Sequence, residues 1–219
     1  MNVLIVSPHP DDETLGAGGT AFRFAAEGKN VSWLNITGAE QDSRFSDEFK
    51  EKRKIQLKKI EELYRFENVY NLNLKTTRLE TYDSSDVIEK ISAIFKEAEP
   101  EMLILPDYND VHSDHKKVFE WCYACSKIFR FPFVRQIMTM EIVSETEFGS
   151  PQNPFYPNYY VDITDYMDKK IQAMEIYDTE LAAPPFPRSI ENIKALAAFR
   201  GAAAGVKYAE AFRLVKSVV

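Results

Sequence analysis

Short apolar runs alternate with longer segments of helical periodicity along this chain. Strands buried on both faces are expected to be short and continuously apolar, as are residues 3–6, 31–36, 69–74 and 102–105. Helical spacing lies between these runs, so the pattern predicts a mostly parallel sheet with helices on both faces. Right-handed crossovers favour the doubly wound strand order 3-2-1-4-5. The predicted fold class is therefore α/β and Rossmann-like.

The same periodicity predicts the remaining elements. The expected helices are 13–27, Ser46 to Tyr64, 86–98, a helix that follows 112–115 and runs toward Ile128, 165–177 and 189–204. Two further strands are expected at 134–143 and 161–163. Segments 37–44 and 148–160 lack a period and are expected to be loops. We expect one domain over 1–219, in which the part from about 134 to 219 completes the site and packs on the Rossmann-like core.

Composition narrows the function classes. With 27 Lys and Arg against 34 Asp and Glu, the net charge of −7 leaves no basic excess for binding nucleic acid. Two cysteines in 219 residues do not form a disulfide scaffold, which suits a reducing compartment. The sequence shows no signal-peptide pattern and no run of the roughly 18 apolar residues that a membrane span needs. We therefore expect a soluble, cytoplasmic protein that binds neither nucleic acid nor a membrane.

Two polar clusters follow the predicted first and fourth strands. Segment 9–13 reads His-Pro-Asp-Asp-Glu, and segment 112–115 reads His-Ser-Asp-His. In the order 3-2-1-4-5 these two strands are neighbours at the topological switch point, where such sheets bind ligands. The clusters are therefore expected to meet in space. Together they contain all three histidines of the chain.

The clusters have the composition of a catalytic metal site. Catalytic zinc takes three His or carboxylate ligands and leaves one position for water, and His9, Asp12 and His115 could supply such a set. Asp11, beside a ligand, could act as the general base that deprotonates the water. Two histidines and one aspartate do not force zinc, so other divalent transition metals stay open.

Simpler explanations exist for each of these residues. A single histidine after a strand is usually an ordinary loop residue. Acids at a helix start complement the helix dipole, which would suffice for Glu13, and Asp114 could cap its helix. Two such clusters at one predicted switch point favour the metal site over these explanations.

Four other features carry weaker signals. Gly16–Gly19 lacks the spacing of a dinucleotide fingerprint, and we interpret it as close helix packing. Cys122 and Cys125 fall well inside a predicted helix and are interpreted as buried cysteines. Arg53 lies among lysines, where a solvated face is the simpler interpretation. The aromatic residues of 155–160 could stack on a sugar ring or pack a loop, and the sequence leaves both open.

The chain resembles the PIG-L/LmbE-like zinc-dependent de-N-acetylases, which act on N-acetylglucosaminyl-phosphatidylinositol and on the glucosamine conjugates of mycothiol and bacillithiol synthesis. That family has a His-Pro-Asp-Asp-Glu box after its first strand and a later His-x-Asp-His box, matched here at 9–13 and 112–115. The resemblance continues through 37–40, Arg53, 161–163 and 208–212 and so covers nearly the whole chain. It implies a Rossmann-like fold.

The resemblance also implies roles for individual residues. His9, Asp12 and His115 would be zinc ligands, and Asp11 the general base. His112, oriented by Asp114, would stabilise the tetrahedral oxyanion or assist leaving-group protonation. Arg53, which matches a family arginine, is expected to contact substrate, and Glu40 and Asn109 are further expected substrate contacts.

Three motifs depart from the family pattern. Its Thr-Arg-Gly-Glu loop is Thr-Gly-Ala-Glu at 37–40, its Arg-x-x-Glu motif ends in Gln56, and Ser113 replaces a common proline.

The expected activity is hydrolysis of an N-acetyl sugar conjugate by metal-activated water. The alternatives are a zinc amidohydrolase acting on a non-sugar amide and an inactive metal-binding module. The sequence leaves open whether identical chains assemble into a homo-oligomer.

Overall fold

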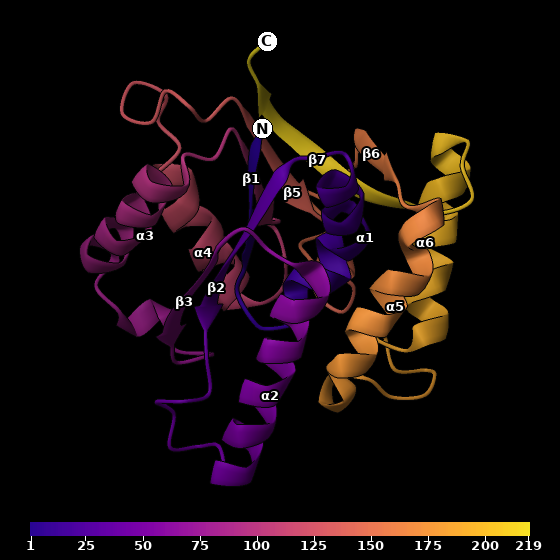
Figure 1. Cartoon of the computed structure of the whole chain (residues 1–219), viewed down its shortest axis with the longest axis horizontal. Helices are drawn as coiled ribbons and strands as arrows, with labels where there is room; N and C mark the ends of the chain where they lie inside the picture. Colours follow the sequence, from indigo (N-terminus) through magenta and orange to yellow (C-terminus); the bar gives the residue numbers. More distant parts are fainter.

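The computed structural model describes residues 1–219 and contains one seven-stranded sheet with helices on both faces (Figure 1). Its strand order is β3-β2-β1-β4-β5-β7-β6. The first five of these strands pair in parallel, whereas β7 is antiparallel to both β5 and β6. The predicted order 3-2-1-4-5 is therefore confirmed, and two antiparallel strands extend it.

The strands are β1 (Asn2–Ser7), β2 (Asn30–Thr37), β3 (Val69–Leu74), β4 (Met102–Pro106), β5 (Gln136–Met140), β6 (Tyr159–Asp162) and β7 (Ala209–Ser217). The helices are α1 (Asp12–Ala26), α2 (Asp47–Tyr64), α3 (Ser84–Ala98), α4 (Ser113–Ala124), α5 (Met167–Ile176) and α6 (Ile190–Ala204). A 3-10 turn, η4 (Asp178–Glu180), follows α5.

The central strand β1 explains why its sequence is continuously apolar. It pairs with β2 on one side and β4 on the other, with Val3 opposite Val31 and Met102. Leu4, Ile5 and Val6 are fully buried because helices cover both faces of the sheet. β1 ends at Ser7, and the first polar cluster begins two residues later at His9.

The core consists of two layers, one on each face of the sheet. One layer packs Leu15 of α1 and Ile171 of α5 against the sheet, together with α2 and α6. The other packs Ile91 of α3 and Trp121 of α4 against the opposite face. Figure 1 shows α3 and α4 on the left of the sheet and α1, α5 and α6 on the right. Successive side chains of β2 point into opposite layers of the core: Trp33 packs in the first layer and Leu34 in the second.

The long helix α2 begins as its sequence predicts. The Oγ of Ser46 accepts a hydrogen bond from the N–H of Phe49 at 3.2 Å, which satisfies one of the free donors of the first turn. The helix ends where Arg65 adopts a left-handed conformation with φ 55°. Segment 38–46, between β2 and α2, forms a loop beside the site, as expected for 37–44 except that Thr37 belongs to β2.

Several predicted boundaries were wrong. The strand β7 follows the last expected helix and was not predicted, because polar side chains, among them the buried Glu210, interrupt its apolar pattern. The helix expected to reach Ile128 ends at Ala124, so Cys125 lies at its C-cap and only Cys122 lies within it. The fifth strand spans only Gln136–Met140, and β6 begins two residues earlier than expected.

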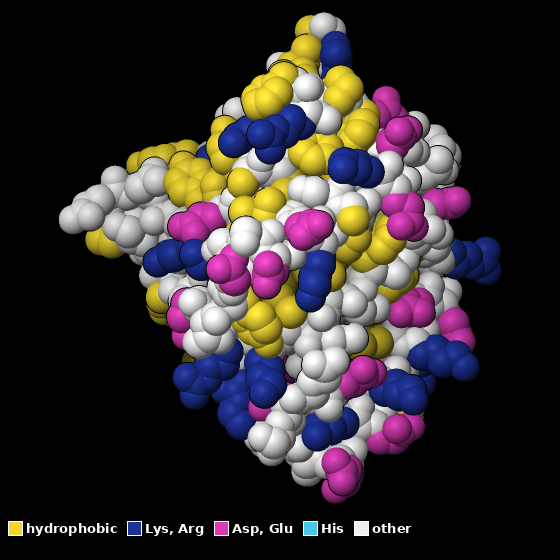
Figure 2. Space-filling view, turned by 90° about the vertical axis from the view of Figure 1, so that its left-hand side faces the viewer, with side chains coloured by type: hydrophobic (Ala, Val, Ile, Leu, Met, Phe, Trp, Pro, Cys, Tyr) yellow, Lys and Arg dark blue, Asp and Glu magenta, His cyan; other side chains and the backbone are white.

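The surface is mixed in character. On the face that carries α3, acidic, basic and apolar side chains are interspersed, and no histidine is visible there (Figure 2). None of the helices has the length and apolar content required to cross a bilayer.

Candidate metal centre and active site

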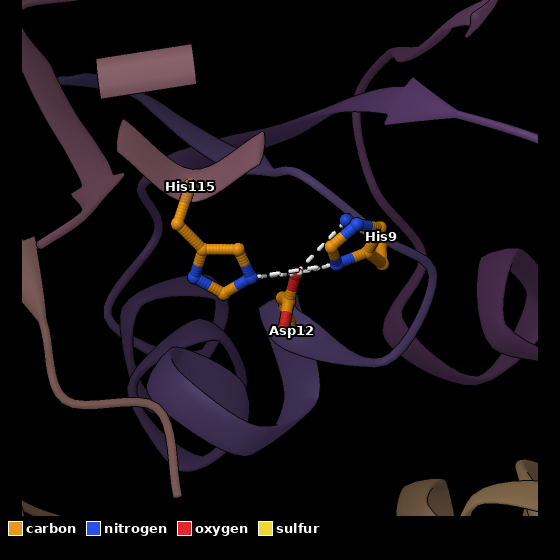
Figure 3. Close-up of side chains that lie close together, drawn as sticks. All are labelled: His9, Asp12 and His115. Carbon is orange, nitrogen blue, oxygen red and sulfur yellow. Dashed lines mark hydrogen bonds and ion pairs between the residues drawn. The ribbon is translucent and has the colours of Figure 1, made fainter. Parts of the chain in front are cut away.

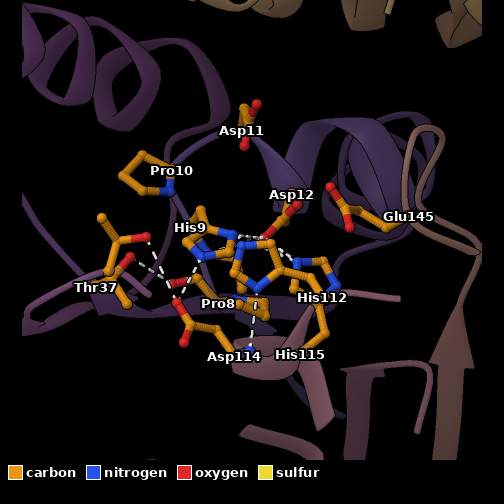
Figure 4. A network of polar contacts seen from close by, with 12 residues as sticks. Pro8, His9, Pro10, Asp11, Asp12, Thr37, His112, Asp114, His115 and Glu145 are labelled. Atoms are coloured by element: carbon orange, nitrogen blue, oxygen red, sulfur yellow. Dashed lines mark hydrogen bonds and ion pairs between the residues drawn. The ribbon is translucent and has the colours of Figure 1, made fainter. Parts of the chain in front are cut away.

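The two polar clusters meet at the carboxyl ends of β1 and β4, as predicted (Figure 4). His9 lies two residues beyond β1, and Asp12 is the first residue of α1. His112 is the N-cap of α4, and His115 lies in the first turn of that helix. Parallel pairing of β1 with β4 thus brings together residues that are far apart in the sequence.

Three candidate ligand atoms, from His9, Asp12 and His115, form a nearly equilateral triangle (Figure 3). The Oδ2 of Asp12 lies 3.3 Å from the Nδ1 of His9 and 3.3 Å from the Nε2 of His115, and the two nitrogens are 3.4 Å apart. A tetrahedral ion with bonds of about 2.0–2.1 Å separates its ligands by about 3.4 Å, because a tetrahedral edge is about 1.6 times the bond length. The predicted ligand set therefore has the spacing of a tetrahedral metal site.

Both histidines of this triangle are held by carboxylates through their other nitrogens. The Nδ1 of His115 lies 2.8 Å from the Oδ2 of Asp110, and the Nε2 of His9 lies 3.0 Å from the Oδ2 of Asp114. Each carboxylate places the ring proton on the nitrogen that it contacts, so the nitrogen facing the triangle keeps its lone pair. This arrangement is characteristic of histidine ligands in metal sites.

The electrostatics of the cluster favour a cation. Burial alone would lower the pKa of His9, but hydrogen bonds to Asp114 and Asp12 raise that pKa to about 9. Burial would likewise lower the pKa of His115, and the charges of Asp12 and Asp110 raise it to about 10. The buried carboxylates therefore attract positive charge to the ring nitrogens, and a divalent ion would satisfy the same field.

A second group of donors, His9, His112 and Asp114, also lies close together. Two of its members are already engaged by backbone groups, because the Nδ1 of His112 accepts from the N–H of Asp114 at 3.1 Å and the Oδ2 of Asp114 accepts from the N–H of Thr77 at 2.7 Å. The first triangle is therefore the better metal site.

Asp11 lies beside the ligands but faces a different partner. Its Oδ2 is 3.0 Å from the Nη1 of Arg188, and its backbone N–H donates to the Oε2 of Glu13 at 3.1 Å. The backbone of Asp11 has φ 121°, a region that residues with a Cβ rarely adopt. Burial raises the pKa of the Asp11 carboxyl well above its ordinary value, and the neighbouring Asp12 adds to this shift. A buried carboxyl of this kind is suited to accept a proton.

Glu13 has more than a helix-dipole role. Besides the N–H of Asp11, its carboxylate accepts from the hydroxyl of Tyr177 at 2.9 Å and from that of Thr14 at 2.8 Å. Burial raises the pKa of Glu13 to about 7. The fully buried Glu13 therefore fixes the unusual backbone conformation of Asp11.

Asp114 contacts His112 through its backbone N–H rather than through its carboxylate. The carboxylate of Asp114 contacts His9 and the N–H of Thr77 rather than the ring of His112. Asp114 does not cap α4 either, since the cap acceptor is the His112 side chain. Asp114 orients His112 only through its backbone N–H, because the short turn at the start of α4 directs the carboxylate back toward β1.

A cavity of about 330 Å³ opens onto this cluster, within the size range of small-molecule sites. His9, Asp11, Asp12 and His112 line its floor, whereas His115 is fully buried behind them. The other lining residues come from the turn between β1 and α1, from the end of β2 through α2, from the segment after β3, and from later parts of the chain: Pro10, Thr37, Gly38, Ala39, Phe45, Phe49, Arg53, Thr76, Glu145, Glu180 and Arg188.

Arg53 is part of this cavity, which contradicts its interpretation as a solvated residue. Only 7% of Arg53 is exposed, its guanidinium pairs with Glu180, and its Nη1 donates to the carbonyl of Pro10 at 3.4 Å. Phe49, one helical turn before it, stacks on Phe45 with ring centroids 4.9 Å apart. The residue that matches the family arginine therefore lies in the cavity wall, whereas its local sequence predicted a solvated face.

The other expected substrate contacts lie elsewhere. Glu40 is exposed and does not line the cavity. The Asn109 side chain donates to the carbonyls of Ser150 and Asn153, so it holds a neighbouring loop. The aromatic segment 155–160 is also remote from the cavity lining, with Phe155 packed under Arg213. Neither Glu40 nor Asn109 therefore lines the cavity, because loop sequence alone does not fix side-chain direction.

Sequence reasoning missed Arg188, Glu180 and Glu145. Arg188 and Glu180 come from the segment between α5 and α6, and Glu145 follows β5. None stands in a motif, and each reaches the cavity only because its segment folds over the ends of the parallel strands. Asp110, the partner of His115, carried a weak signal as an acid shortly before the second box.

The fold and the site define a Rossmann-like protein with a His-Asp-His cluster at its switch point. Residues 4–126, more than half of the chain, match the family model described as GlcNAc-PI de-N-acetylase, PIG-L. The chain therefore belongs to the PIG-L family of de-N-acetylases.

Similar proteins extend this relationship over the whole chain. A diacetylchitobiose deacetylase of Thermococcus kodakarensis is 25% identical over 99% of this chain and 84% of its own length. A probable N-acetyl-α-D-glucosaminyl L-malate deacetylase 2 of Bacillus cereus is 31% identical, over 52% of this chain and 56% of its own. The substrates in these names are those of the relatives.

Solved structures share the fold. A conserved protein of Thermus thermophilus superposes with a TM-score of 0.80 at 24% identity, covering 100% of this chain and 96% of its own. The N,N'-diacetylchitobiose deacetylase of Pyrococcus horikoshii gives 0.78 at 23% identity, covering 98% and 83%. A 4-carboxy-2-hydroxymuconate hydratase of Pseudomonas putida also shares the fold, with a TM-score of 0.75 at 17% identity over 100% and 98% of the two chains. The fold alone therefore does not fix the reaction.

Proposed function

We propose that this protein is a metal-dependent deacetylase that removes the acetyl group from an N-acetylated amino sugar of the N-acetylglucosamine type. The observation that carries the proposal is the 3.3–3.4 Å triangle of His9, Asp12 and His115, with Asp11 beside it at the floor of a cavity. Membership of a de-N-acetylase family and the names of the relatives support the choice of an acetylated amino sugar.

The metal would be held by the Nδ1 of His9, the Oδ2 of Asp12 and the Nε2 of His115. Two imidazoles and one carboxylate suit zinc and other divalent transition metals, and we propose one zinc ion. When bound, such an ion polarises a carbonyl and lowers the pKa of water.

Asp11 would accept the proton of the attacking water. Its carboxylate faces the cavity and is held by Arg188, while Glu13 fixes its backbone. A positioned general base typically contributes about 10²–10⁴-fold to a rate. The same carboxyl could then return the proton to the departing amine, so that acetate and the free amino sugar are the products.

His112 would stabilise the developing oxyanion. Its Nδ1 accepts the N–H of Asp114, so the neutral ring carries its proton on Nε2, free to donate into the cavity. Burial lowers the pKa of His112 to about 4, and this keeps the ring neutral at neutral pH. One such donor is typically worth about 10²–10³-fold in kcat.

The walls of the cavity suit a sugar. The stacked rings of Phe45 and Phe49 offer an apolar surface to a pyranose face. Arg53, Glu145 and Glu180 offer hydrogen-bonding groups to hydroxyls. Glu145 lies across the histidine cluster from Thr37, so polar groups line both sides of the metal centre (Figure 4).

The test is release of acetate from a panel of amides by the purified, zinc-loaded protein. The panel contains N-acetylglucosamine, diacetylchitobiose, N-acetylglucosaminyl conjugates and non-sugar acetamides. We expect activity on at least one acetylated sugar, loss of activity with a chelator, and loss of at least about 100-fold in Asp11→Asn with zinc retained. Preference for non-sugar amides would overturn the substrate class. Absence of any hydrolysis by the zinc-bound protein would overturn the proposed function.

A further inference from the structure

Helix α1, which carries the metal ligand Asp12 and follows Asp11, is interrupted. Ala17 has φ −142° and ψ 16°, far from helical values, and divides the helix into two parts. In a regular α-helix the N–H of Gly19 would donate to the carbonyl of Leu15, four residues earlier. In α1 each of these two groups has a side-chain partner from another part of the chain.

The partners are Lys170 of α5 and Glu210 of β7. The Nζ of Lys170 donates to the carbonyl of Leu15 at 2.7 Å, and the Oε1 of Glu210 accepts from the N–H of Gly19 at 2.9 Å. Lys170 and Glu210 bond to each other at 2.6 Å. The pair therefore spans the interruption and joins the carbonyl to the N–H through two charged side chains.

The Lys170–Glu210 pair is buried, and both oxygens of Glu210 are hydrogen-bonded to α1. The Oε2 of Glu210 accepts from the N–H of Thr20 at 2.7 Å, so both carboxylate oxygens are used on the helix. The side chains of Lys170 and Glu210 are only 5% and 4% exposed. A buried ion pair contributes little net stability compared with apolar residues of the same size, because desolvation offsets the attraction. Stability alone therefore does not account for charged residues at this point.

Geometry indicates a different role. The interruption lies five residues after Asp12, so it sets the direction of the short turn that carries the ligand. On its other side the helix is held tightly, since a Cβ on Gly19 would lie 2.7 Å from the side chain of Ile163. Helix α5 also reaches the first turn through Tyr177, its C-cap residue, which donates to Glu13. Figure 1 shows α5 and the start of β7 beside α1.

We infer that Lys170 and Glu210 are positioning residues of the active site: by replacing a helical hydrogen bond at the interruption of α1, they fix the orientation of the turn that carries Asp11 and Asp12. The inference rests on the proposed function for the roles of those two aspartates. It also assigns a purpose to the Gly16–Gly19 segment and to the C-terminal strand, because close packing and Glu210 are both needed to hold the bent helix.

The experiment compares two double variants that each remove an ion pair and keep its size. Lys170→Met with Glu210→Gln removes the pair on α1. Glu141→Gln with Arg200→Met removes a pair of 2.5 Å that joins α6 to the end of β5 and makes no hydrogen bond to α1. Zinc affinity is measured by competition with a chromophoric chelator, alongside thermal unfolding and kcat at saturating zinc.

We expect the α1 pair variant to bind zinc at least about 10-fold more weakly than the control pair variant, with kcat lowered as well, as for residues that orient metal ligands indirectly. A purely structural pair would lower the melting temperature but leave the zinc affinity and kcat within about 3-fold of the control, and this would overturn the inference. Glu210→Asp provides a second variant that keeps the charge: its shorter side chain cannot reach both N–H groups, and we expect an intermediate loss of zinc affinity.

The outcomes separate this inference from the proposed function. If the unaltered protein binds zinc but hydrolyses no amide, the proposed reaction fails, whereas the zinc-affinity comparison still decides the role of the pair. If the unaltered protein binds no divalent metal, the positioning of a metal ligand by Lys170 and Glu210 is overturned.

Discussion

The carboxylate of Asp114 lies 3.0 Å from the Nε2 of His9, so a residue of α4 orients a histidine that follows β1. The same carboxylate accepts the N–H of Thr77 at 2.7 Å, which ties it to the segment after β3. Asp110 holds His115 in the same manner. The candidate metal site is thus assembled from the ends of two neighbouring strands, and a carboxylate from the β4–α4 region contacts each of His9 and His115.

This contact predicts the effect of Asp114→Asn. The variant leaves His9 without a carboxylate to fix its ring proton, so zinc affinity should fall about 10–100-fold while kcat at saturating zinc changes less. Asp42→Asn is the matched control, because Asp42 is also buried and ion-paired but lies outside the cavity lining. Competition with a chelator measures the affinity. Unchanged affinity with a lower kcat would instead assign Asp114 to His112.

Zinc should stabilise the folded chain. Because the ligand triangle exists only in the folded state, zinc at about 100 times its dissociation constant adds about 2.7 kcal/mol to the free energy of unfolding. For a chain of this size that corresponds to a rise in melting temperature of about 5–10 °C, removed by a chelator. His115→Ala should abolish the rise, whereas Asp11→Asn should keep it. A rise that survives His115→Ala would place the ion elsewhere.

Arg188 should matter for turnover but not for metal binding. Its Nη1 holds the carboxylate of Asp11 at 3.0 Å and contacts Glu180 at 3.6 Å, whereas no hydrogen bond joins it to the ligand triangle. Arg188→Met should lower kcat/KM by up to about 100-fold through misplacement of Asp11, with zinc affinity unchanged. Arg23→Met, which breaks an ion pair on the surface of α1, should leave both quantities near the unaltered values. Equal effects of the two variants would refute this role.

Arg53 and Glu40 should differ in their effect on substrate use. Arg53 is buried at the cavity wall and pairs with Glu180, so Arg53→Ala should lower kcat/KM at least about 10-fold. Glu40 is exposed outside the lining, and Glu40→Ala should stay within about 3-fold. Steady-state kinetics on the best substrate of the panel measures both. A large effect of Glu40→Ala would show that its loop closes over bound substrate.

Much of the parallel half of the fold could be predicted from the sequence. Continuously apolar runs such as Val3–Val6 have few structural interpretations, and right-handed crossovers leave few strand orders. The order then places segments 9–13 and 112–115 at one crevice, so the ligand triangle followed from strand order and residue type together. Prediction failed where a polar side chain is buried, as in β7, because the buried Glu210 interrupts the apolar pattern by which a strand is recognised.

The sequence by itself determined the switch point and the three residues of the ligand triangle, because strand periodicity and histidine placement are local properties. Only the tertiary structure decided which carboxylate holds which histidine, that Arg188 faces Asp11, and that Lys170 and Glu210 join across the interruption of α1. Those contacts link residues from different elements, and their partners are set by side-chain direction and close packing. Neither side-chain direction nor close packing between elements can be predicted from the sequence of one segment.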